Sequence, residues 1–153
     1  MHGKKHTVRL NNVLFPVWML MLFWQTWLLV LPGNFLIDSA VLLLSLLTFD
    51  KDARKTLYKK HIGKVFCFGL LADFIGAALL FVLMMVFELG QMGDELYLTL
   101  PALLLSAALI FAFNYFFTFR SEEAALRKRL ALTFAIVTAP YTFLIPSRWI
   151  YGF

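Results

Sequence analysis

The stretch that decides the fold is VFCFGLLADFIGAALLFVLMMVF, residues 65–87, in which Asp73 is the one charged residue. A helix rises 1.5 Å per residue, so a stretch of this length can cross the hydrocarbon layer of a bilayer, about 30 Å. The whole chain is 61% hydrophobic and 15% charged. Soluble domains run nearer about 45–50% apolar and about 25% charged. This composition excludes both a water-soluble globule and a disordered chain.

Four other apolar stretches approach the same length, and turn-forming or charged residues separate them. The predicted spans are residues 13–31, 35–49, 65–87, 100–119 and 130–145. The first two are joined by Pro32-Gly33-Asn34, a typical turn sequence. We therefore predict an all-α fold: a single transmembrane domain, residues 1–153, in which five transmembrane helices form a polytopic integral membrane bundle.

The distribution of charge predicts the orientation of this bundle. If the N-terminus is cytoplasmic, all of the 14 lysines and arginines except Arg148 fall on the cytoplasmic side. This agrees with the positive-inside rule and places the C-terminus outside. The outer connection, 88–99, carries Glu88, Asp94 and Glu95. We therefore expect a cytoplasmic (inner or plasma) membrane, with the first apolar run kept as an uncleaved span.

Asp73 is the strongest candidate for an intramembrane polar site, because an aspartate near the middle of a bilayer should face protein or water. Gly69, Gly76 and Ala77 lie on its helix face and would let another helix approach closely. Asn114 on the 100–119 span is its predicted partner. The pair has three interpretations: a structural hydrogen bond, a proton or cation relay or substrate contact, and a contact with another subunit.

Two further polar residues lie in the first two predicted spans. Asp38 is three residues into its span, where a carboxylate suits a helix start and can cap it together with Asn34. It would then lie near the opposite leaflet from Asp73. Gln25 is predicted to pack against a neighbouring helix.

The last span and the longest cytoplasmic loop carry the remaining patterns. In the span, Ala131, Ala135 and Ala139 form a small-residue packing ridge, and Pro140 should kink the helix. The loop, 50–64, is predicted to anchor topology or to contact anionic lipid headgroups. Its basic residues are Lys51, Arg54, Lys55, Lys59, Lys60 and Lys64, and His61 beside them is expected to be solvated.

The chain lacks the usual sequence signatures of catalysis. It contains no HExxH, GxSxG or Walker motif and no cluster of cysteines and histidines. His2 and His6 have no carboxylates or thiols near them, so we predict no metal site and no cofactor. The basic excess is an orientation signal, so nucleic acid is not an expected partner. We do not expect an enzyme.

Residues 64–120 resemble GtrA-type membrane proteins in one span that opens KVFCFGLLADFIG and a later span that closes FNYFFTFR. The resemblance implies a role in moving polyprenyl-linked sugars. The predicted five spans depart from the four-span layout of that family.

Three functions are therefore compatible with the sequence. The first is a non-enzymatic accessory or scaffold subunit that packs against another membrane subunit or a second copy through small-residue faces. The second is a small transporter or polyprenyl-lipid-linked flippase that uses the intramembrane Asp73. The third is a membrane sensor or regulator that acts through the basic loop, 50–64.

Overall fold

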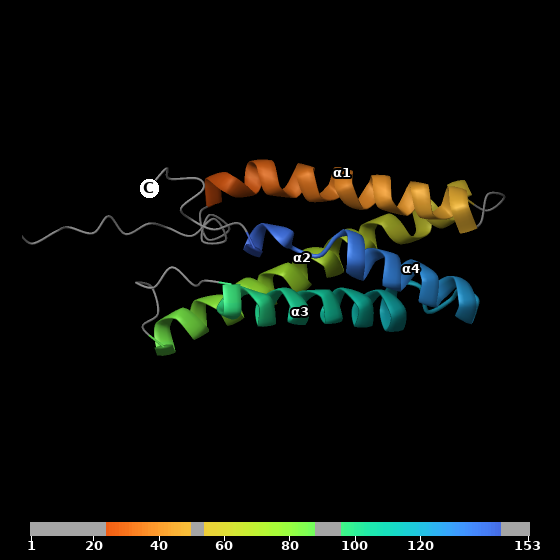
Figure 1. The fold of residues 1–153 in the computed structure, drawn as a ribbon. Coiled ribbons are helices and arrows are strands. Elements are labelled where there is room, and N and C mark those ends of the chain that lie inside the picture. The colour runs from red at the N-terminus through yellow and green to blue at the C-terminus, as the bar shows by residue number, and fades with distance from the viewer. Residues whose placement is uncertain (1–23, 50–53, 88–95, 145–153) are drawn as a thin grey trace, which may run out of the picture.

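The computed structural model describes residues 24–49, 54–87 and 96–144, which form helices and no strand. Four α-helices and two short helical segments follow one another along the chain (Figure 1). They are α1 (Trp24–Phe49), α2 (Arg54–Phe87), α3 (Leu96–Phe113), the π-helix η2 (Asn114–Thr118), α4 (Ala124–Val137) and the 3₁₀-helix η3 (Tyr141–Leu144).

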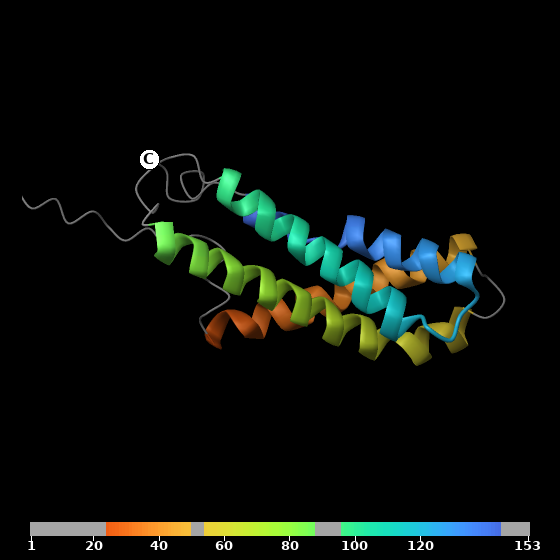
Figure 2. The same ribbon diagram turned by 90° about the horizontal axis from the view of Figure 1, so that it is seen from below.

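The four α-helices run alternately up and down and pack in a ring. α2 contacts α1 and α3, and α4 closes the ring by contacting α3 and α1 (Figures 1 and 2). α1 ends where α2 begins, and η2 ends where α4 begins, at the same end of the bundle. We call it the basic end, because it holds every lysine and arginine of the described residues: Arg54, Lys55, Lys59, Lys60, Lys64, Arg120, Arg127, Lys128 and Arg129.

Three of the described helices are long and apolar enough to cross a membrane: Trp27–Phe49, Arg54–Leu83 and Thr99–Thr118. The outer surface supports the same conclusion, because large apolar side chains such as Leu29 (80% exposed) and Leu104 (61% exposed) point away from the bundle. The interior holds polar side chains instead, Asp38, Asp73 and Asn114 among them. An apolar exterior over a partly polar interior suits lipid and not water. The prediction of a helical membrane bundle is confirmed at this level.

The predicted turn at residues 32–34 is wrong. α1 continues through Pro32 from Trp24 to Phe49, so residues 24–31 and 35–49 belong to one helix. Pro-Gly-Asn favours a turn in water, but an open turn in an apolar layer leaves several backbone N–H and C=O groups unpaired. Continuing the helix loses only the hydrogen bond that Pro32 cannot donate. Residues 13–23 of the predicted first span lie outside the described residues.

The predicted loop at 50–64 is largely helical. From Arg54 onward it forms the first three turns of α2, which carry the basic residues on a rigid element. These turns contain no proline, and lysine, arginine and leucine are good helix formers.

The predicted last span is interrupted. α4 begins at Ala124, six residues before the prediction, and ends at Val137, so its 14 residues extend about 21 Å. Pro140 breaks the helix rather than kinking it, because the residue before a proline avoids the α conformation. The chain resumes as η3, which packs against α3. The predicted span at 100–119 agrees closely with α3 and η2.

Two apolar clusters fill the interior, one in each half of the bundle. The basic-half cluster contains Val41, Leu42, Leu46, Leu57, Val65, Ala72, Ile110, Phe119, Leu130, Phe134 and Ala135. The distal cluster contains Ala77, Leu80, Ala102, Leu103, Ala139 and Phe143. On α2, Asp73 lies between Ala72 of the first cluster and Ala77 of the second. The candidate site is therefore at the boundary between the two halves.

Candidate functional site

Two buried aspartates from neighbouring helices form the centre of the candidate site. Asp38 on α1 is 6% exposed, and Asp73 on α2 is 8% exposed. A Cβ placed on Gly69 would lie 3.5 Å from Asp38 Oδ2, so the Asp38 carboxyl group rests against the helix face one turn before Asp73. Gly69 allows this close approach because it has no side chain.

Among the described residues, no basic side chain lies beside the two carboxyl groups to balance their negative charge. Asp73 Oδ1 is fully buried and accepts no hydrogen bond from the described residues, and no lysine or arginine among them lies outside the basic end. Two unpaired carboxylates in an apolar layer would cost several kcal/mol. Charged pairs of like sign avoid this cost by holding a proton or a cation between them. The aspartate pair is therefore suited to binding one of these ions.

The prediction that Asp38 caps a helix start near the opposite leaflet from Asp73 is wrong. Asp38 lies in the middle of α1, well past Asn34, and faces α2. The error follows from the turn predicted at 32–34, which moved the helix start to within three residues of Asp38. Once α1 is continuous, the Asp38 carboxyl group lies against α2 at Gly69, one helical turn from Asp73.

Asn114 does not bind Asp73. Its Nδ2 donates to the Ile110 carbonyl oxygen at 3.0 Å, one turn back on its own helix, and its Oδ1 is buried without a partner among the described residues. Ser106 lies level with Asp73 instead, and its hydroxyl donates to the Ala72 carbonyl oxygen at 3.2 Å. Asn114 lies two turns nearer the basic end, so the predicted hydrogen bond cannot form.

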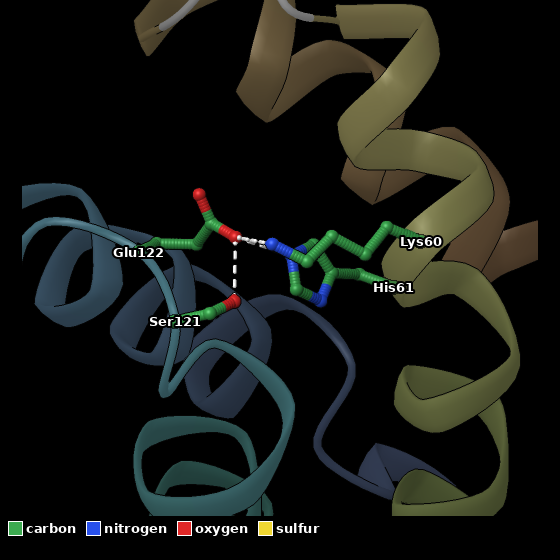
Figure 3. Close-up of polar contacts among 4 residues, drawn as sticks. All are labelled: Lys60, His61, Ser121 and Glu122. Atoms are coloured by element: carbon green, nitrogen blue, oxygen red, sulfur yellow. Dashed lines mark hydrogen bonds and ion pairs between the residues drawn. The ribbon is translucent and has the colours of Figure 1, made fainter.

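A second polar cluster joins α2 to the connection between η2 and α4 at the basic end (Figure 3). Glu122 Oε1 accepts from Lys60 Nζ at 2.7 Å and from Ser121 Oγ at 2.9 Å, and it lies 2.8 Å from His61 Nε2. Burial raises the pKa of Glu122, but the hydrogen bonds from these three side chains and the charge of Lys60 outweigh it. The result is a pKa lowered from 4.5 to about 2. Glu122 is therefore ionised and ties two elements together.

His61 is buried, although the sequence predicted that it would be a solvated loop residue. It is 1% exposed and packs its ring against Phe119, with ring centroids 5.1 Å apart. The signal that could have identified it is the spacing of Leu57, His61 and Val65. These residues occupy every fourth position and form one face of the helix that begins at Arg54.

The other basic residues divide into paired and free cations. Lys60 is engaged by Glu122, and the Arg127 guanidinium donates to Tyr115 Oη at 3.1 Å and lies over its ring. Arg54, Lys55, Lys59 and Lys64, predicted to contact anionic headgroups, are exposed at the basic end, together with Arg120 and Lys128. Arg129 is exposed too, but its guanidinium lies over the Phe49 ring, 5.8 Å from the centroid. Lys51 lies outside the described residues. The described part of the chain holds no group of three or more potential metal ligands.

The small-residue faces are used within the chain. A Cβ on Gly76 would collide with Ser106 Oγ and lie 3.3 Å from the Ala102 carbonyl oxygen, so α2 and α3 touch there. Ala77, Ala135 and Ala139 belong to the two apolar clusters, and Ala131 is also fully buried. Gln25 belongs to α1, but its side chain lies outside the described part of the structure.

Comparisons with known proteins add no family. Neither protein-family models, nor curated proteins, nor solved structures gave a match to this chain. The candidate site therefore stands on its geometry alone.

Proposed function

We propose that this chain is a small proton-coupled membrane transporter in which the Asp38–Asp73 pair is the proton-binding site. The observation that carries the proposal is the burial of two carboxyl groups on neighbouring helices, with Asp38 Oδ2 against α2 at Gly69, one turn from Asp73. Placing an ionisable residue inside a membrane bundle costs free energy, and acidic residues in such positions typically relay protons in pumps and transporters.

The chemistry of the pair favours a proton as the bound ion. A proton on one carboxyl group removes one of the two charges and supplies a donor that the other carboxylate can accept. Loss of that proton restores the repulsion between α1 and α2. Protonation therefore changes the free energy of contact between two helices, which is the coupling that a transporter needs.

The accessory-subunit function was suggested by the lack of a catalytic motif and by small-residue faces, and the second of these observations no longer supports it. It was motivated by small-residue faces left free for a partner, but Gly76 and the alanines of α4 pack against other helices of this chain. The regulator function required a free basic loop. Arg54–Lys64 are instead part of a long helix, and Lys60 is bound to Glu122.

We propose that the basic end lies in the cytoplasm, in accordance with the positive-inside rule. α1 then enters the bilayer from the outer side, and η3 returns to that side, in keeping with an external C-terminus. A cytoplasmic N-terminus would require residues 1–23, which lie outside the described residues, to cross the bilayer. With the first apolar run, the chain would approach the five crossings predicted from the sequence.

Proton flux in proteoliposomes tests the function. We expect the wild-type chain to acidify vesicles loaded with a pH-sensitive dye when a potassium diffusion potential, negative inside, is imposed. Asp73→Asn and Asp38→Asn should each lower this flux by roughly a hundredfold, the lower range for removing a positioned proton-transfer group. Repeating the assay at the same potential with and without external sodium distinguishes the two ions, because a site that takes up sodium instead would acidify the vesicles less.

Glu123→Gln is the matched control, because it also removes one carboxylate but from an exposed position at the start of α4. Its flux should equal that of the wild type. Wild-type flux in both aspartate variants, with normal folding, would refute the role of the pair.

A further inference from the structure

The two halves of the bundle, one on each side of the aspartate pair, differ in the number of buried polar atoms that lack a hydrogen-bond partner among the described residues. Between the pair and the basic end, three buried side-chain atoms make no hydrogen bond within the described part of the chain: His61 Nδ1, Thr118 Oγ1 and Asn114 Oδ1. Their residues are at most 1% exposed. Buried polar atoms are normally paired, and an unpaired one typically binds a buried water. Three of them in one half of a small bundle require an explanation.

These residues follow two helix stripes, one on α2 and one on α3 and η2. On α2 the stripe runs from His61 through Val65 and Gly69 to Asp73, with one residue in every turn. On η2 and α3 the stripe runs from Thr118 through Asn114 and Ile110 to Ser106. The Ser106 hydroxyl donates a hydrogen bond to the Ala72 carbonyl oxygen of α2. At the basic end His61 packs on Phe119, the residue after Thr118. The unpaired atoms therefore succeed one another along the contact between α2 and the helix made by α3 and η2.

Among the described residues, the opposite half of the bundle has no buried polar side-chain atom that lacks a hydrogen-bond partner. There the distal cluster consists of alanine, leucine and phenylalanine side chains, with Leu80 and Ala102 fully buried. Ser106, the nearest hydroxyl, already donates to Ala72. Beyond Gly76, the Phe143 ring and Ala102 fill the space against α2. Where it is described, this half is packed mainly by apolar side chains.

We propose that buried water joins His61, Thr118 and Asn114 into a proton path that connects the aspartate pair to the basic end. The path rests on the proposed function, which makes the pair a proton site. A buried water makes about three hydrogen bonds, so two or three of them would satisfy the unpaired atoms and link donors and acceptors from His61 as far as Asn114.

One apolar layer lies across this path. Val65 and Ile110, each 1% exposed, stand on their helices between Asn114 and Asp73. A narrow apolar layer between wet regions controls passage by excluding water. Val65 and Ile110 therefore set the rate at which a proton reaches the pair, while Asn114 and Thr118 hold the water that delivers it.

Charged neighbours are confined to the two ends of the path. His61 faces Glu122 from the connection before α4, with Lys60 and Lys64 on its own helix. Asp73 faces Asp38 on α1. Among the described residues, α3 and η2 contribute no charge to the path between these ends. A proton therefore moves from a carboxylate–imidazole pair at the surface to a carboxyl pair inside.

Rapid acidification of the protein in lipid nanodiscs tests the path. Infrared spectroscopy then follows the carbonyl stretch of protonated carboxyl groups, assigned to the pair by its loss in Asp38→Asn and Asp73→Asn. Asn114→Leu and Thr118→Val keep the side-chain size but remove the polar atoms. We expect each to slow protonation of the pair roughly tenfold, a modest part of what a positioned proton relay contributes. The final amplitude should not change.

Ile110→Ala should act in the opposite direction, accelerating protonation roughly tenfold because it opens the apolar layer to water. Leu80→Ala is the matched control, since it makes a similar cavity in the distal cluster and should leave the rate unchanged. Acceleration by Leu80→Ala equal to that by Ile110→Ala, or wild-type rates in both polar variants, would overturn the path and leave the proposed function standing. Absence of any carbonyl band assigned to the pair would overturn both.

Discussion

At the scale of single residues, the aspartates show what a sequence can predict. Asp73 could be identified because it interrupts an otherwise apolar span and has glycines on its own face. Asp38 could be identified as polar, but its partner could not, because pairing depends on the depth at which each helix crosses its neighbour. Moving one helix start by a few residues changed a capping residue into half of a buried pair. Depth is a property of the packed bundle and is not encoded in either span alone.

Glu122 gives a prediction about stability and pH. Its pKa is lowered in the folded state, so its contacts with Lys60, His61 and Ser121 stabilise the fold above pH 4.5. This contribution is lost as the pH falls from 4.5 towards 2. Glu122→Gln should therefore lower the Tm at pH 7, and the difference from wild type should disappear near pH 2. Thermal unfolding in mild detergent at several pH values measures both effects.

Glu123→Gln serves as the comparison, because Glu123 is exposed and makes none of these contacts. Its Tm should follow the wild type at every pH. A Tm difference for Glu122→Gln that is the same at pH 7 and pH 2 would show that shape, and not charge, holds the cluster together.

At the scale of helices, the sequence predicted where the apolar stretches lie better than where helices begin and end. The 100–119 span agrees with α3 and η2 because charged or polar residues bound it on both sides. The start of α2 was missed because charged residues were assigned to a loop, although their side chains suit the exposed face of a helix. The break before Pro140 was anticipated as a kink, since proline marks the place but not the size of the disturbance.

The contact between α2 and α3 gives a prediction about two glycines of one helix. Gly76→Ala places a Cβ against Ser106 and the Ala102 carbonyl, so it should destabilise the fold by roughly 1–3 kcal/mol. Gly63→Ala meets no atom within 4 Å on the exposed side of the same helix. It should stabilise the fold by about 0.4–1 kcal/mol, because alanine restricts the unfolded chain.

Thermal or denaturant unfolding of both variants in the same detergent measures the contrast. The opposite signs are the essential result, since both changes add one methyl group to one helix. Equal effects at the two positions would mean that α2 and α3 do not touch at Gly76.

At the scale of the whole molecule, composition and charge were sufficient to predict a membrane bundle. The apolar exterior and the common basic end both follow from sums over many residues, so an error of a few residues in one helix does not affect them. The order of the helices around the ring cannot be obtained in this way. It depends on contacts such as Gly76 against Ser106, which join positions far apart in the chain.

The proposed orientation predicts which surface labels reach. In a Cys67→Ser background, Lys59→Cys at the basic end should react with a membrane-impermeant maleimide only after the cells are opened. Asp94→Cys, in the connection predicted to lie outside, should react in intact cells. Labelling of Lys59→Cys in intact cells would reverse the orientation, and labelling of both would indicate chains inserted in two directions.

The π-helix η2 carries a consequence for how this sequence can vary. A π-helical turn holds one residue more than an α-helical turn, as the hydrogen bond from the Phe119 N–H to the Asn114 carbonyl records. Deleting one residue from this segment would restore an ordinary helix and rotate everything beyond it by about 100°. Glu122 would then leave His61, and α4 would present a different side to α1 and α3. Substitutions within η2 should therefore disturb the fold far less than the deletion of one residue. The length of this segment is under stricter constraint than its composition.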